Sequence, residues 1–123
     1  MAEPRTLPEW LPEWSVEITP TLVVSTAIAT RDFQDVHHDR DRAQAAGSKD
    51  IFVNILTSQG LVQRYVTDVL GHDLDIAAID VRLGAPAYPG DTLVFSGERA
   101  GDVVSVTGRV SLGDHVIGKV TLR

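Results

Sequence analysis

The chain has 123 residues, which fits one domain, and 43% of them are hydrophobic, as in an ordinary globular protein. Its net charge of -6 argues against a nucleic-acid partner, because neutralising phosphate groups needs a basic patch. It has no cysteine, which excludes disulfides, thiolate catalysis and Cys-ligated zinc. No apolar run has the length of a membrane span and residues 1–10 lack the apolar core of a secretory signal, so a cytoplasmic protein is expected.

The N-terminal part divides into an arm and the start of a domain. Residues 1–14 contain "PEW" twice and three prolines, which predicts an arm with neither helix nor strand. Its two tryptophans are expected to pack on the domain body, residues 15–123. The β-branched run "TLVVSTAIAT" then predicts a strand over residues 21–30.

One helix and several strands follow. Residues 41–47, "DRAQAAG", fit a short helical turn ended by Gly47. Helical spacing of apolar residues predicts a helix over residues 54–70 that ends at Gly71, with close backbone packing at Gly60. Strands are predicted over residues 76–83, 92–99, 103–112 and 115–123, with a type II turn at residues 88–91. The order predicts an α+β fold in which a curved antiparallel meander of four strands covers one central helix.

A charged stretch lies between the two apolar segments. Residues 31–42, "RDFQDVHHDRDR", hold four aspartates, three arginines and two adjacent histidines. Three interpretations compete: a solvated loop, a metal site and an acid/base site. Neighbouring side chains of an extended chain point in opposite directions, so His37 and His38 do not easily bind one ion, although His37 could do so with a nearby aspartate. His115, beside a predicted hairpin turn, is expected at the surface.

The acid/base interpretation needs a carboxylate and an imidazole that reach one water molecule. Asp32 and His37 are five residues apart, which suits a loop that folds back on itself. Negative charge that develops on a substrate also needs donors, and the backbone N–H groups of Asn54 and Ile55 lie at the positive end of the predicted helix. Since only the backbone is used there, glycine at position 54 is expected to be tolerated.

The residues of this loop resemble a known motif. The stretch "DFQDVHHD" is similar to the hydratase motif of the MaoC-like hot-dog family of (R)-specific enoyl-CoA hydratases. "IFVNIL" takes the place of the segment that opens the family's central helix, with Asn54 where glycine is usual, and "RLGAPAYPGDTL" is similar to a second family motif. The resemblance covers about residues 20–123. Within the family, the pattern resembles most the small, motif-bearing subunits of steroid side-chain enoyl-CoA hydratases from cholesterol-degrading bacteria.

The resemblance implies a single hot-dog domain that hydrates a trans-2-enoyl-CoA, a steroid thioester with a shortened side chain, without a metal or other cofactor. Asp32 and His37 are then catalytic: His37, or the pair together, removes a proton from water, and Asp32 returns a proton at the α-carbon. Arg82 and Phe52 are candidates for substrate contact. It also implies a heteromer with a second hot-dog chain that lacks the Asp/His pair, and Tyr65 and Phe52 are candidates for the surface facing it. Two alternatives stay open, an acyl-CoA thioesterase and a non-catalytic acyl-CoA-binding subunit, because one fold hosts all three.

Overall fold

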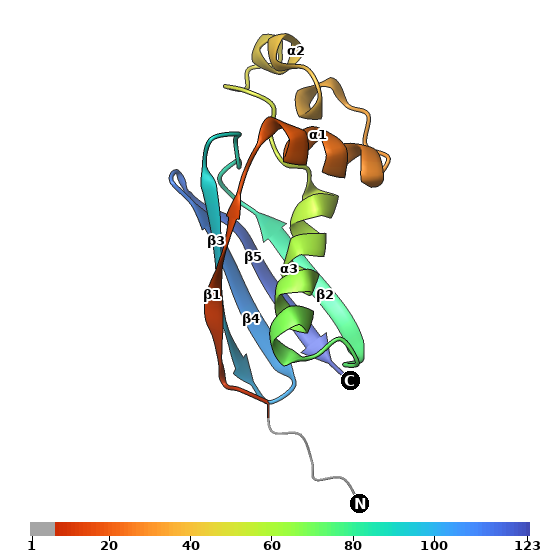
Figure 1. Cartoon of the computed structure of the whole chain (residues 1–123), viewed down its shortest axis with the longest axis vertical. Helices are drawn as coiled ribbons and strands as arrows, with labels where there is room; N and C mark the ends of the chain where they lie inside the picture. Colours follow the sequence, from red (N-terminus) through yellow and green to blue (C-terminus); the bar gives the residue numbers. More distant parts are fainter. Residues whose placement is uncertain (1–6) are drawn as a thin grey trace, which may run out of the picture.

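The computed structural model describes residues 7–123 as one antiparallel sheet with a long helix lying across it (Figure 1). The elements in chain order are β1 (Trp10–Glu17), α1 (Pro20–Ala29), the 3-10 turn η1 (Asp35–His37), α2 (Arg40–Ala45), α3 (Ile55–Leu70), β2 (Ile76–Leu83), β3 (Thr92–Ala100), β4 (Val103–Val110) and β5 (Gly113–Leu122). The shorter helices α1 and α2 lie at one end of the sheet, beyond the N-terminal end of α3. This is the predicted α+β hot-dog architecture, a sheet around one central helix.

The strand order is β1-β3-β4-β5-β2. The predicted meander is therefore right for β3, β4 and β5 and wrong for β2, which pairs with β5 at the far edge. The physical reason is the connection between β2 and β3, which is too long for a tight hairpin and can cross the end of the sheet. Gly84 and Ala85 begin this crossing by donating their backbone N–H groups to the carbonyls of His115 and Asp114, both at 2.8 Å.

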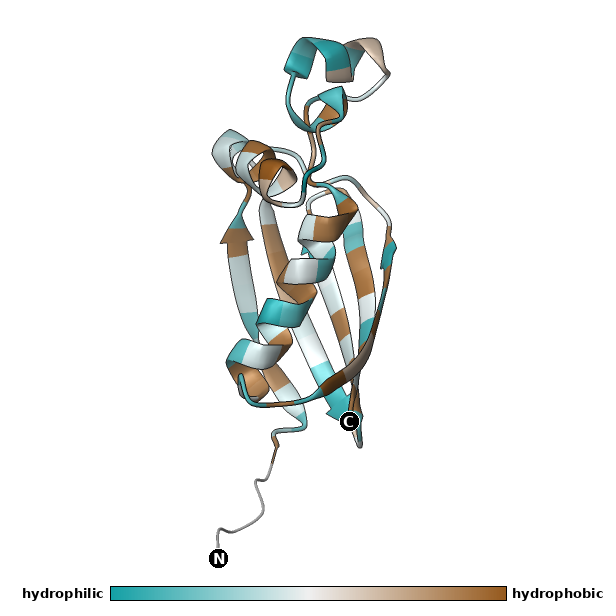
Figure 2. Cartoon of the chain, turned by 90° about the vertical axis from the view of Figure 1, so that its right-hand side faces the viewer, coloured by the Kyte–Doolittle hydropathy of each residue, from teal (hydrophilic) through white to brown (hydrophobic). Residues whose placement is uncertain are grey.

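The central helix α3 begins one residue after the predicted start and has the predicted end. Asn54 is its N-cap, and Gly71 ends it with a φ of 125°. Its apolar stripe packs on the sheet with Val62 and Val66 fully buried, and Figure 2 shows apolar and polar bands alternating along this helix. The expected close packing at Gly60 is wrong, because a Cβ atom there would meet nothing within 4 Å. No helix in the part of the chain described here is long and apolar enough to cross a membrane.

The predicted unstructured arm is wrong from Trp10 onward. Residues Trp10–Glu17 form β1, which pairs with β3 and crosses the expected boundary between residues 14 and 15. Pro12 is tolerated because β1 is an edge strand and its pairing shifts register between Leu11 and Trp14, where no ladder hydrogen bond is needed from the proline. The part of the arm at residues 1–6 lies outside the described residues.

The predicted strand over residues 21–30 is the helix α1. Thr19 caps it by accepting a hydrogen bond from the Leu22 N–H at 3.0 Å, and Pro20 occupies the first turn. At the other end, the hydroxyl of the C-cap residue Thr30 donates to the Thr26 carbonyl one turn earlier, at 2.9 Å. Arg31 then takes a left-handed conformation with a φ of 57°, and this turn delivers Asp32 to the end of α3.

Aromatic rings anchor β1 to α3. The ring of Trp14 lies 6.3 Å from that of Tyr65 and 5.5 Å from that of Phe95, so the prediction that this tryptophan packs on the body is confirmed. Trp10 is instead exposed. The Tyr65 side chain is 1% exposed and its hydroxyl donates to the Pro12 carbonyl at 2.7 Å. The expectation that Tyr65 faces a partner is therefore wrong, because the residue belongs to the core.

Replacing Tyr65 by phenylalanine tests this anchor. The variant keeps the ring packing but leaves the Pro12 carbonyl without its donor, so we expect a loss of about 1 kcal/mol in unfolding free energy. Tyr65→Ala, which also removes the ring, should cost roughly 3–5 kcal/mol. Urea unfolding followed by circular dichroism measures both, and equal losses in the two variants would contradict the anchoring role of the ring.

Candidate active site

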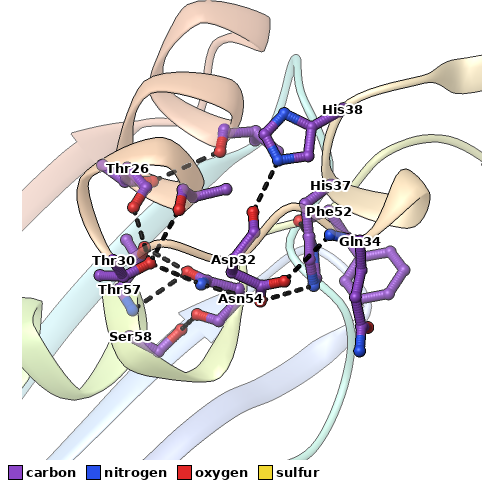
Figure 3. A network of polar contacts seen from close by, with 12 residues as sticks. Thr26, Thr30, Asp32, Gln34, His37, His38, Phe52, Asn54, Thr57 and Ser58 are labelled. Atoms are coloured by element: carbon purple, nitrogen blue, oxygen red, sulfur yellow. Dashed lines mark hydrogen bonds and ion pairs between the residues drawn. The ribbon is translucent and has the colours of Figure 1, made fainter.

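Asp32 and His37 meet at the N-terminal end of α3, as the acid/base interpretation predicts. Asp32 follows the end of α1 and His37 closes the turn η1, and this loop brings Asp32 Oδ2 to 3.3 Å from His37 Nε2. Figure 3 shows the two side chains facing each other beside Asn54. The His37 side chain is buried, whereas that of Asp32 is 22% exposed, so the carboxylate keeps access to solvent or a ligand.

The His37 ring has a fixed orientation. Its Nδ1 atom lies 2.7 Å from the Phe52 carbonyl oxygen. Because a carbonyl can only accept, Nδ1 carries the hydrogen, and Nε2 of the neutral ring presents a lone pair toward Asp32. The Phe52 ring also packs edge-on against the imidazole, with 4.9 Å between the ring centres. His37 is thus held with its basic nitrogen aimed at the carboxylate.

The Asp32 carboxylate is held in its ionised form. Burial alone would raise the pKa of Asp32, but the Asn54 side-chain hydrogen bond, the Gln34 backbone N–H and the nearby histidines together lower this pKa below its ordinary value. The Asn54 amide donates to Oδ2 at 3.1 Å and the Gln34 N–H donates to Oδ1 at 3.2 Å. Asp32 is therefore a carboxylate, not a carboxylic acid, at neutral pH.

The side chain of Asn54 is part of the site, which the sequence prediction missed. Its amide nitrogen donates to Asp32 Oδ2 and to the Thr30 hydroxyl at 2.9 Å, while its oxygen accepts from the Thr57 N–H at 3.1 Å and from the Thr57 hydroxyl. Asn54 is 2% exposed, so these bonds form in a water-poor environment. One residue caps α3 and holds the carboxylate. The expectation that glycine is tolerated at position 54 no longer follows.

The second histidine of the motif has a different role. His38 Nε2 donates to the backbone carbonyl of Asp32 at 2.7 Å, and its ring stacks on the exposed Phe33. His37 and His38 therefore contact different groups of Asp32 and do not converge on one point. In residues 7–123, no group of three His, Asp or Glu side chains is arranged to hold a metal ion.

A pocket of ≈ 280 Å³ opens beside His37 and provides space for a ligand; Asp32 is not part of its lining. It is lined by His37, Phe52, Val53, Asn54, Ile55, Leu83, Gly84, Pro86 and His115. The N-terminus of α3 borders it, where the first N–H groups of a helix have no intrahelical partner. Of the two candidates for substrate contact, Phe52 lines the pocket. Arg82 does not; it borders a separate hollow with Ile117 and Lys119.

His115 was expected at the surface, and this is wrong. The residue is 2% exposed and lines the pocket. Its burial lowers the pKa of the imidazole, although a hydrogen bond with the Ala85 carbonyl works in the opposite direction. The sequence carries no signal for this position, because the pairing of β4 with β5 shifts register between Gly108 and Arg109 and disturbs the alternation near the turn.

Comparisons with known proteins identify the family to which this chain belongs. The model of the MaoC like domain family matches residues 8–119. The beta subunit of 3-oxo-4,17-pregnadiene-20-carboxyl-CoA hydratase from Mycobacterium tuberculosis (strain ATCC 25618 / H37Rv) is 62% identical over 108 residues, which are 84% of this chain and 84% of the relative.

Two solved structures extend the comparison. The crystal structure of the ChsH1-ChsH2 complex from Mycobacterium tuberculosis contains a chain that is 55% identical, with a TM-score of 0.88 over 96% of this chain and 98% of that chain. An (R)-hydratase from A. caviae involved in PHA biosynthesis has a TM-score of 0.83 at 16% identity, over 99% of this chain and 98% of that chain, and shares the fold. On the family match and the 62% identical relative, this chain belongs to the MaoC-like domain family.

Proposed function

We propose that this chain is the catalytic subunit of an enoyl-CoA hydratase that adds water to a trans-2-enoyl-CoA, a steroid thioester with a shortened side chain, in cholesterol degradation. The observation that carries the proposal is the pair of Asp32 Oδ2 and His37 Nε2, 3.3 Å apart at the N-terminal end of α3. The name of the 62% identical relative, a pregnadiene-carboxyl-CoA hydratase subunit, supports this substrate class.

The pair is arranged to hold one water molecule. Neutral His37 presents a lone pair at Nε2, and the ionised Asp32 presents another at Oδ2, so the two atoms repel unless both accept from one shared donor. A water molecule can donate one hydrogen to each atom. Its remaining lone pairs then point away from both, toward the space in which the β-carbon of an enoyl thioester would lie.

The proton balance follows from the same geometry. As the water oxygen forms its bond to the β-carbon, one water proton moves to His37 Nε2 and the double-bond electrons move toward the thioester carbonyl. The imidazolium lies beside the Asp32 carboxylate, which stabilises its charge. The proton at Nε2 then passes to the α-carbon and regenerates neutral His37. This assigns the returned proton to His37 and not to Asp32, because the lowered pKa of Asp32 leaves that carboxyl unprotonated.

The thioester oxygen needs donors when it becomes enolate-like. Ile55 is the first residue of α3 and Asn54 is its N-cap, and both line the pocket. Their backbone N–H groups lie at the positive end of the helix dipole, where developing negative charge is stabilised. These two groups are the oxyanion donors of the proposed mechanism.

A substrate panel separates this function from its alternatives. Crotonyl-CoA, a steroid enoyl-CoA and saturated acyl-CoAs are each incubated with the protein, alone and with its partner chain. Loss of enoyl absorbance without free thiol supports a hydratase. Release of free thiol from the saturated thioesters would instead indicate a thioesterase, and saturable binding with neither reaction would indicate a binding subunit.

The proposal includes a second hot-dog chain that lacks the Asp/His pair. Strand β2 is an edge of the sheet, and apolar side chains beside the pocket, Ile55 and Leu83, remain partly exposed on this chain. A catalytically silent partner could cover them and widen the tunnel for fused rings. The similar chain of known structure comes from a complex of two different proteins, which supports a heteromer with a second chain.

Co-expression tests the partner. We expect the chain alone to hydrate the steroid enoyl-CoA at least tenfold more slowly than the co-purified heteromer, because the tunnel walls are then incomplete. Light scattering gives the mass of each form, and enoyl absorbance gives the rate. A stable homodimer with full activity on the steroid thioester would contradict the need for a second chain.

A further inference from the structure

We infer that His115 and Ser58 are positioning residues that hold the oxyanion end of α3 against the opposite wall of the pocket; this inference rests on the proposed hydratase function. Ser58 Oγ and His115 Nε2 lie 2.7 Å apart, although the residues belong to α3 and β5. Both side chains are buried, at 0% and 2% exposure. Their contact is therefore a fixed link across the interior.

The direction of each hydrogen bond is set by the Ala85 carbonyl. His115 Nδ1 lies 2.7 Å from this oxygen, which can only accept, so Nδ1 carries the hydrogen. Nε2 of the neutral ring is then an acceptor, and the Ser58 hydroxyl donates to it at 2.7 Å, since its other neighbour, the Asn54 carbonyl oxygen, is farther away at 3.3 Å. Burial lowers the pKa of His115, in agreement with a neutral ring. Both ring nitrogens of His115 form hydrogen bonds within the protein. His115 therefore has a structural role at the pocket wall, and His37 carries out the proton transfer.

Ser58 transmits this link to the proposed oxyanion donor. The Ser58 N–H donates to the Asn54 carbonyl at 3.2 Å, and the side-chain link to His115 holds the Ser58 backbone that makes this bond. That carbonyl belongs to the same planar peptide unit as the N–H of Ile55, and the C=O and N–H of a trans peptide point in opposite directions. Holding the carbonyl toward Ser58 therefore turns the Ile55 N–H outward from the helix end, toward the pocket that Ile55 lines.

The other end of the link fixes the facing wall. The loop at residues 84–86 lines the pocket with Gly84 and Pro86. His115 binds it twice, since its side chain donates to the Ala85 carbonyl and its own carbonyl accepts from the Gly84 N–H at 2.8 Å. A Cβ atom on Gly84 would collide with the Asp114 carbonyl, so the loop approaches β5 closely. The bonds of His115 and Ser58 thus set the spacing between the loop and the first turn of α3.

Variants of the two residues test the inference in the active heteromer. Ser58→Ala removes the hydroxyl, and His115→Asn keeps a donor for Ala85 but removes the acceptor for Ser58. Each is expected to lower kcat roughly tenfold with KM changed less than about twofold, since misplaced oxyanion donors weaken transition-state binding. The kcat of the double variant should be about that of the less active single variant, because both substitutions remove the same interaction.

Val62→Ala is the matched control, because Val62 is buried one turn after Ser58 on α3, has no polar side-chain group and does not line the pocket. It should lower Tm at least as much as Ser58→Ala while kcat stays within about twofold of the wild type. If Ser58→Ala retains wild-type kcat, or if the losses of the two single variants multiply in the double variant, the positioning role is wrong.

Nitrogen NMR shifts give a test that does not depend on activity. The wild-type His115 ring should show the hydrogen at Nδ1, and the Ile55 amide resonance should shift in Ser58→Ala more than in Val62→Ala. A hydrogen at Nε2, or an unshifted Ile55 amide, would overturn the inference by itself. A wild-type heteromer that hydrates no enoyl-CoA would instead overturn the proposed function, so the two failures are distinguishable.

Discussion

Replacing His37 by alanine or Asp32 by asparagine should lower the rate of hydration by on the order of a hundredfold or more while the fold survives. His37→Ala removes the nitrogen that takes and returns the proton, and Asp32→Asn removes the charge that holds the water and stabilises the imidazolium. The rate is followed by loss of enoyl absorbance from the steroid thioester. Circular dichroism and Tm check that each variant is folded.

His38→Ala is the matched control for His37→Ala. The two histidines are neighbours, but His38 binds the Asp32 backbone carbonyl and does not face the carboxylate. Its loss should slow the reaction much less than the loss of His37, and overnight incubation with a chelator should leave the wild-type rate unchanged. Equal losses at His37 and His38, together with inactivation by the chelator, would favour a metal site over the acid/base pair.

Asn54→Gly should lower kcat about tenfold, because the variant loses a hydrogen bond to a charged group worth roughly 1.5–3 kcal/mol. The lost bond is that from Nδ2 to Asp32 Oδ2, at 3.1 Å. Glycine keeps the backbone N–H and costs a helix cap only a few tenths of a kcal/mol, so the loss reports on the side chain. A glycine variant with wild-type kcat would show that Asn54 acts through its backbone alone.

The same substitution should change the pH dependence. The Asn54 bond helps to keep the pKa of Asp32 below its ordinary value, so removing the bond raises this pKa. The titration of the Asp32 carboxyl, followed by carbon NMR, should therefore move to higher pH in Asn54→Gly than in the wild type. Asn54→Asp keeps a capping oxygen but places a second carboxylate beside Asp32, and should move this titration further in the same direction.

Local patterns predicted the central part of the fold. Helical spacing with Asn54 before it and Gly71 after it gave α3, and alternation between glycine turns gave β3, β4 and β5 with small errors at their ends. Local propensity misled at α1, where a β-branched run suggested a strand. The stronger signal was Thr19-Pro20, a capping residue followed by a residue suited to the first turn.

The predictions that failed depend on contacts between distant parts of the chain. The edge position of β2 follows from a crossing connection, and β1 is a strand because β3 offers it an edge. Neither feature can be predicted from the residues of the strand alone, because a short or proline-containing segment becomes a strand only where another strand can pair with it.

In the candidate site, too, the residues of one short motif could be predicted, whereas the contacts between distant residues could not. Asp32 and His37 lie in one short motif and could be named from it. The family match supports the resemblance from which they were named. The side-chain bonds of Asn54 to Thr30 and Asp32, and the contact between Ser58 and His115, join residues far apart in sequence, and no spacing rule predicts them.

The most direct test of the hydratase claim is the fate of the water oxygen. The heteromer is incubated with the steroid enoyl-CoA in water labelled with heavy oxygen, and the products are examined by mass spectrometry. We expect an intact CoA thioester that has gained one labelled oxygen as a hydroxyl at the β-carbon, formed at a rate that falls at least about a hundredfold in His37→Ala. Label found in a free carboxylic acid, with release of CoA, would contradict the claim and identify a thioesterase.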